Sequence, residues 1–408
     1  GIFMNGVVET DRSQWSVDAA WRHLDGEEGY RLEARFGGLD VQEFLGDQAT
    51  ADVKSGSTLE LRIVQPFDAD GAPKDGLMTA TLSGGKLDIG ADLQTAMADT
   101  VLNFQVFPAK NQIELAPSML RFSDMQASAI GGIRFPGKPS DTQADRVAAT
   151  KFEIILNDML AHGMSEPDKA RPGAIQLSGE LHADRLEFDT LLLKTSTGDM
   201  KGSGQMGLSA DDGRLKLRLD IAEMGVTDFK EFWPAFLAPG LRVWARDGIT
   251  DGKITDAWVV ADAPLTEVFG EARFSNDEMR ANVDLSGTRI KLPGQLPSIT
   301  NTKGKIDYAG VTTSVSVSSG KANLGSRGSV AITNGLLEVG DYNLPVIPAE
   351  LSMDMSGPAT ALFELGKRKP LEFSKTSGLE SRGMKGTFKT SMKASLGIGK
   401  DVTLRDNR

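Results

Sequence analysis

Strict alternation of apolar and polar residues is the feature of this sequence that most constrains its fold. It is clearest at 214–221, RLKLRLDI, where leucine or isoleucine takes every second position and charged residues take the others. Successive side chains of a β-strand point to opposite faces, so a period of two predicts a strand with one apolar and one wet face. The pattern recurs at 86–93, 152–156, 175–181, 281–285 and 311–317.

Turn-forming residues separate these runs at short intervals. They stand at 83–85 (SGG), 211–213 (DDG), 275–277 (SND), 309–310 (AG) and 333–335 (TNG). Such clusters predict hairpin turns, so we expect consecutive strands to be antiparallel, on the order of 25 to 30 of them. Glycine contributes 45 of the 408 residues, more than its usual share of roughly 7%, which fits frequent turns.

One region departs from the alternation, the stretch GVTDFKEFWPAFLAPGLRVWARDGI at 225–249. Its apolar residues recur at helical spacing, with Thr227 or Asp228 as the candidate N-cap. We predict a short helical insertion at about 226–247. The chain would then divide into a β-segment at 1–224, the insertion at 225–248 and a second β-segment at 249–408. The residues that mark the insertion are Phe232, Trp233, Pro234 and Trp244.

A sheet with one apolar face must cover that face by closing on itself or by packing on another layer. Aromatic residues make up 6% of the chain and show no girdle rhythm, which argues against a barrel embedded in a membrane. We predict a mainly all-β chain whose elongated, curled antiparallel sheet forms a hydrophobic groove. Eight alternating residues are predicted to line it, unless they are ordinary core: Leu215, Leu217, Leu219, Ile221, Val283, Leu285, Val315 and Val317.

The residues that common chemistries require are missing or scattered. A net charge of −11 argues against a nucleic-acid partner, and the lack of cysteine excludes disulfides and zinc fingers. His23, His162 and His182 fit no metalloenzyme motif, and we expect GSGQMG at 202–207 to be a turn between hairpins. The sequence predicts no catalytic residues, no metal and no cofactor, and therefore no enzyme.

Two groups of motifs carry a resemblance to a known family. The first is FWP at 232–234, LRVW at 241–244 and GITDGKI at 248–254; the second is LPVIPAE at 344–350, SGPA at 356–359 and KPL at 369–371. Over about 225–375 the chain resembles AsmA-like proteins of the YhdP type, which are related to TamB and to bridge-like lipid-transfer proteins. The family has no catalytic residues to carry over.

The resemblance implies the periplasmic part of a protein anchored in the inner membrane of a Gram-negative bacterium. Its expected partners are phospholipid and the inner and outer membranes, or their proteins, between which lipid would move. The chain opens and closes in strand-like runs, GIFMNG and KDVTLR, so we expect a segment of a longer protein. A second hypothesis stays open, that of a β-rich scaffold for outer-membrane protein biogenesis that carries no lipid.

Overall fold

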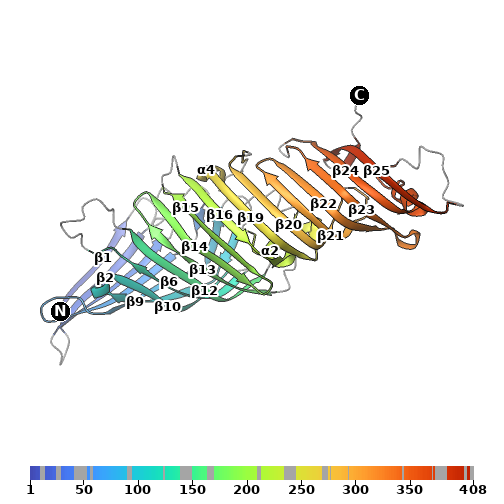
Figure 1. Ribbon diagram of the computed structural model, residues 1–408. Helices are drawn as coiled ribbons and strands as arrows, with labels where there is room; N and C mark the ends of the chain where they lie inside the picture. The colour runs from blue at the N-terminus through green and yellow to red at the C-terminus, as the bar shows by residue number, and fades with distance from the viewer. Residues whose placement is uncertain are drawn as a thin grey trace. The chain divides into compact units, whose positions relative to one another are not determined.

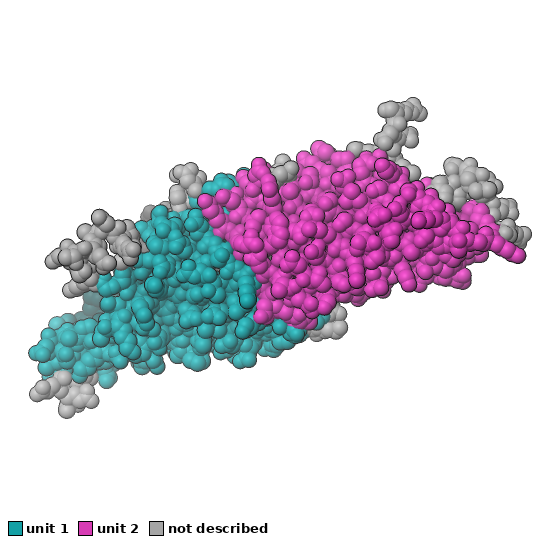
Figure 2. All heavy atoms as spheres, viewed as in Figure 1, with its two compact units in different colours: residues 1–196, 201–215, 264–271 teal, residues 197–200, 216–263, 272–408 magenta. Residues whose placement is uncertain are grey.

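The structure is a computed structural model, and it confirms the predicted fold class. It describes residues 1–9, 14–23, 29–40, 53–55, 58–89, 94–122, 125–137, 149–162, 170–208, 213–233, 245–268, 274–275, 277–292, 294–341, 344–369, 371–372, 384–398 and 402–404. These residues contain 26 strands and a few short helices (Figure 1). Twenty-three of the strands belong to one antiparallel sheet. The chain divides into two compact units, which Figure 2 shows in different colours.

Unit 1 comprises residues 1–196, 201–215 and 264–271. Eleven of its strands pair in sequence, each antiparallel to the next. They are β1 (Ile2–Glu9), β2 (Gln14–His23), β3 (Tyr30–Asp40), β5 (Thr58–Phe67), β6 (Gly76–Leu82), β9 (Thr100–Phe107), β10 (Gln112–Arg121), β11 (Met125–Arg134), β12 (Thr150–His162), β13 (Ala170–Leu181) and β14 (Arg185–Thr195). The segment 202–207, expected to be a turn, lies inside the strand β15 (Asp199–Gly207).

A second, three-stranded sheet interrupts this order. It consists of β4 (Val53–Ser55), β7 (Gly85–Ile89) and β8 (Gln94–Met97). β7 pairs with β4 and β8, while β6 pairs with β9, so the predicted hairpin between β6 and β7 is wrong. A 3-10 turn, η1 (Pro108–Lys110), joins β9 to β10.

Unit 2 comprises residues 197–200, 216–263 and 272–408. Its sheet runs antiparallel from β19 to β26. All or most residues of these strands lie in it: β16 (Arg214–Ile221), β17 (Met224–Gly225), β18 (Ile249–Thr250), β19 (Lys253–Pro264), β20 (Met279–Ile290), β21 (Ile299–Ala309), β22 (Thr312–Asn323), β23 (Ser329–Val339), β24 (Ile347–Pro358), β25 (Thr387–Ile398) and β26 (Val402–Leu404). Its short helices are α2 (Val226–Glu231), η2 (Gly325–Arg327) and α5 (Ala359–Leu365), whereas α4 (Leu265–Val268) belongs to unit 1.

The predicted helical insertion begins as α2 at Val226, as expected, but its N-cap lies two residues before Thr227 and three before Asp228, the predicted caps. Gly225, the last residue of β17, is the N-cap and is still extended, with φ −62° and ψ 137°. Asp228 lies inside the helix, where its carboxylate accepts a hydrogen bond of 2.6 Å from the Thr197 hydroxyl. This tertiary bond replaces the predicted capping bond. Of the marker residues, Phe232 is the C-cap, whereas Pro234 and Trp244 lie outside the described residues.

The predicted turn at 333–335 is instead an irregularity within β23, because the ladder to β24 shifts register there. Asn334 takes up the shift with φ +49°, a left-handed conformation that asparagine adopts more readily than most residues. By contrast, Gly310 forms the predicted turn between β21 and β22 with φ +52°. A turn signal in the sequence therefore marked a bend of the backbone in both places, but ended a strand in only one.

Candidate functional site

Strand pairing in unit 1 brings one residue from each of eleven strands into a single row. Each member is the register partner of the next. We call it the unit 1 apolar row, because ten members have apolar side chains and the eleventh is glycine. Its members, in order, are Met4, Ala19, Ala34, Ile63, Met78, Phe104, Leu115, Gly131, Ile154, Leu177 and Leu191.

The opposite face of the same strands carries more polar residues, although Leu77 and Val101 are exposed on it. Asn103 and Gln105 flank Phe104 and are exposed, while Gln176 next to Leu177 donates a hydrogen bond of 3.0 Å to Glu153. The alternation seen in the sequence therefore separates a wet face from an apolar one, as the period of a strand requires.

The unit 1 apolar row is not sealed from solvent. Ala34 is its one buried member, Met4 is 56% exposed and Ile154 is 42% exposed. The other members are half-buried. A second row beside it, Val17, Phe36, Leu61, Ala80 and Leu102, is likewise half-buried except for Ala80. An apolar surface of this length that stays partly open to solvent is typical of a binding surface.

A hollow of about 470 Å³ lies where β10, β11 and β12 meet. Its apolar lining includes Leu115 of the row and Phe152, and its charged lining includes Arg134 and Lys151. Two carboxylates, Glu114 and Glu153, line it as well. The charged residues belong to the face opposite the row, where Arg134 and Lys151 are register partners. Arg134 donates a hydrogen bond to Gln112, and Lys151 pairs with Glu180.

Unit 2 has a comparable row, but the protein itself covers most of it. The members are Ala257, Val283, Ile306, Val315, Leu337, Leu351 and Ala394. All are buried except Leu337 and Ala394, which are half-buried. We call these seven residues the unit 2 apolar row.

The helix α2 provides part of this cover. Phe229 and Trp233, whose ring centroids are 5.0 Å apart, close an apolar cavity of about 30 Å³ over Val283 and Leu285. Of the eight predicted lining residues, seven are buried and Leu217 is half-buried. Their contact with lipid stays a prediction, because here they contact the chain itself.

One buried lysine ties α2 to the segment that follows it. Lys230 is 7% exposed, and its ammonium donates hydrogen bonds to the carbonyls of Arg246 (3.0 Å) and Ile249 (2.9 Å). These carbonyls belong to the helical turn at 245–248 and to β18. A buried charge is tolerated where such bonds satisfy it, so Lys230 fastens the cover over the unit 2 apolar row.

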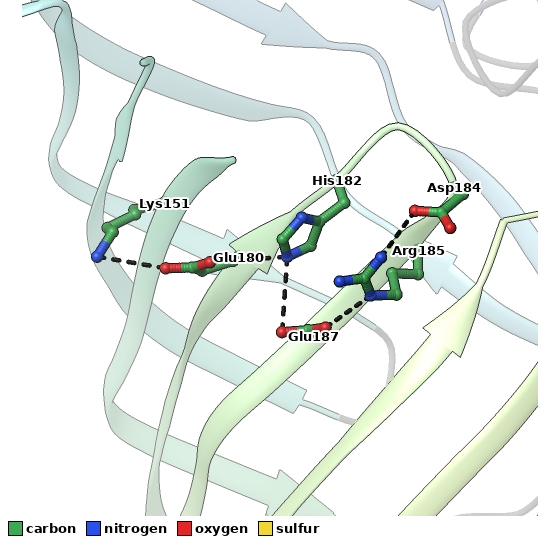
Figure 3. Close-up of polar contacts among 6 residues, drawn as sticks. All are labelled: Lys151, Glu180, His182, Asp184, Arg185 and Glu187. Atoms are coloured by element: carbon green, nitrogen blue, oxygen red, sulfur yellow. Dashed lines mark hydrogen bonds and ion pairs between the residues drawn. The ribbon is translucent and has the colours of Figure 1, made fainter. Parts of the chain in front are cut away.

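The face of unit 1 opposite the apolar row carries a cluster of polar residues. In it, Glu180, His182 and Glu187 each direct one candidate ligand atom toward a common point (Figure 3). Glu180 and Glu187 are register partners on β13 and β14, and His182 lies in the turn between them. Judged by spacing alone, the three histidines were scattered and no metal site was predicted. The signal that reveals this cluster is the hairpin register. His23 instead packs edge-on against Tyr30, and the side chain of His162 lies outside the described residues.

Comparison with known proteins adds no relative. No protein-family model, curated protein or solved structure matches the chain. Within the described part of the chain, none of the helices combines the length and the hydrophobicity needed to span a bilayer.

Proposed function

We propose that this chain is the periplasmic segment of an AsmA-like protein, anchored in the inner membrane, that conducts phospholipid between the inner and outer membranes. It does so without catalysis. One observation carries the proposal: the unit 1 apolar row crosses eleven strands without a charged member and is left partly open to solvent. The resemblance of 225–375 to that family supports the cellular setting.

The length of the row favours conduction over storage at one place. Neighbouring strands lie about 4.8 Å apart, so ten steps span roughly 48 Å. One leaflet contributes about 15 Å to a hydrocarbon core of about 30 Å. An acyl chain therefore occupies about a third of the row, and successive lipids would line up along it.

The chemistry of the row favours movement along it. Moving an acyl chain of about 16 carbons from water to an apolar face gains on the order of 10 kcal/mol before costs, at roughly 0.8 kcal/mol per CH₂. For lipid to move, this gain must be similar at each step. Side chains such as Ile63, Met78 and Leu177 differ in shape but not in polarity, so they present a nearly even surface. The head group would stay in water, at the open side of the row.

Site-specific photo-crosslinking tests the proposal. A photoreactive amino acid at Phe104 or Leu177 is expected to capture phospholipid in cells, detected by mass spectrometry of the purified adduct. Asn103 is the matched control, because it neighbours Phe104 on the same strand but faces the polar side. A photoreactive amino acid at Val283 should capture lipid only when α2 detaches from the sheet, because α2 covers that residue.

Failure to capture lipid at Phe104 and Leu177, under conditions where the protein is functional in cells, would contradict the proposal. Capture at Asn103 as often as at Phe104 would also contradict it, because it would show contact without a preferred face. Capture of an outer-membrane barrel protein in place of lipid would instead support the scaffold hypothesis.

A further inference from the structure

The cluster around His182 is arranged so that each carboxylate has one oxygen already bound and one oxygen left for another group. Lys151 contacts Oε1 of Glu180 at 3.3 Å, and the Arg185 Nε donates to Oε1 of Glu187 at 2.6 Å. The Oε2 atoms of both glutamates face Nε2 of His182, at 3.6 Å and 3.5 Å (Figure 3). The two cations thus fix the orientation of the carboxylates without occupying the point between them.

The distances at this point do not fit hydrogen bonds. N–H···O bonds span roughly 2.7–3.2 Å, and Nε2 of His182 is a buried atom that makes no hydrogen bond to any described residue. The distances fit a metal instead. Nitrogen and oxygen ligands at about 2.0–2.2 Å from a tetrahedral zinc lie about 3.3–3.6 Å from one another. All three candidate ligand atoms lie within 4.8 Å of one another.

The net charge of the cluster also favours a bound cation. Glu180, Asp184 and Glu187 bring three negative charges, and Lys151 and Arg185 bring two positive ones. With a neutral imidazole the cluster has a net charge of −1.

We propose that Glu180, His182 and Glu187 form a binding site for one divalent cation of the zinc class on the polar face of unit 1. Three protein ligands leave the fourth tetrahedral position for water or for an exogenous anionic group. Lys151 and Arg185 act as outer groups that hold the ligands in orientation. The site lies on the face opposite the unit 1 apolar row, so it does not depend on the proposed lipid function.

Zinc binding to the full chain, first stripped with a chelator, tests the site. We expect one Zn²⁺ per chain by isothermal titration calorimetry, and a shift of the His182 Nε2 resonance in ¹⁵N NMR spectra on addition of zinc. His182→Gln and the double variant Glu180→Gln, Glu187→Gln should abolish this binding. Lys151→Met should weaken it by roughly 10- to 100-fold, the usual effect of losing an outer group.

Two matched variants serve as controls and should bind zinc as the parent does. Glu60→Gln removes another glutamate paired with an arginine, since Arg35 Nε lies 2.9 Å from Glu60. His23→Gln removes another histidine of unit 1. Circular dichroism checks that each variant is folded. Absence of stoichiometric zinc binding to the parent chain would overturn the proposal, as would full binding by folded His182→Gln, or a His182 resonance that responds to protons but not to zinc.

Discussion

How much a single apolar residue stabilises this protein depends on which side of a strand it occupies and on what covers it. Ile254 on β19 pairs with Leu285 and is 1% exposed, whereas Leu77 on β6 is 58% exposed. We expect Ile254→Ala to lower the free energy of unfolding by about 2–5 kcal/mol, because a buried cavity is left behind. Leu77→Ala should change it by less than about 0.5 kcal/mol. Urea unfolding followed by circular dichroism compares the two, and equal effects would contradict the assignment of faces.

A second prediction at this scale concerns Asp354 on β24. The Ser391 hydroxyl (2.6 Å) and the Asn334 amide (2.8 Å) donate hydrogen bonds to its carboxylate and lower its pKa. A lowered pKa in the folded state gives stability that is present above the unfolded value of about 3.9 and is lost as the pH falls through the folded value. Ser391→Ala should raise the pKa of Asp354, as measured by ¹³C NMR of the carboxyl group. Ser395→Ala, which removes a hydrogen bond to Glu350 instead, should leave that pKa unchanged.

At the scale of elements, the cover of the unit 2 apolar row depends on Lys230. Lys230→Met would leave the carbonyls of Arg246 and Ile249 without the ammonium, at a cost of about 1–3 kcal/mol. We expect amide hydrogen exchange to accelerate at 226–231 and 245–249 and to stay unchanged in β22 to β25. Lys253→Met is the control, because Lys253 pairs with Glu223 at the surface. Uniform acceleration across unit 2 would show that α2 does not open separately.

The sequence allowed the strands to be predicted far better than their partners. Alternation at 281–285 and 311–317 located β20 and β22, because each strand needs only its own side chains to show its two faces. It did not reveal that β6 pairs with β9, since pairing depends on residues distant in sequence. The helix α5 was also missed. Its buried residues Ala361, Phe363 and Leu365 alternate like those of a strand, and their position is set by packing on the sheet.

The candidate site was predictable to a similar degree. The eight predicted lining residues were chosen from the sharpest alternation, and that alternation marks the best-covered part of the sheet. Members of the unit 1 apolar row such as Ile154 and Leu177 also stand in alternating runs, so alternation alone does not separate open positions from covered ones. Their common row follows only from the register of several strands. The same holds for the metal-ligand cluster. Glu180 and Glu187 are direct partners across β13 and β14, and this follows from the register of the hairpin and not from their spacing in the sequence.

At the scale of the whole chain, the two units differ in how their apolar rows are covered, and conduction should depend on the open one. Leu115→Arg places a charge in the middle of the unit 1 apolar row. We expect it to lower lipid transfer between donor and acceptor vesicles by at least tenfold, because the row no longer offers an even apolar surface. Asn103→Arg, on the polar face, should transfer lipid as the parent does. Equal transfer by both variants would contradict the role of the row.

The small sheet of β4, β7 and β8 has a consequence for how such a protein can change over evolutionary time. The chain leaves the main ladder twice to build this sheet, first as β4 between β3 and β5, and then as β7 and β8 between β6 and β9. The flanking strands still pair directly, β3 with β5 and β6 with β9. The row from Met78 to Phe104 is uninterrupted. Segments placed between neighbouring strands therefore leave the row intact, so insertions or deletions at these two connections are compatible with an unchanged main sheet.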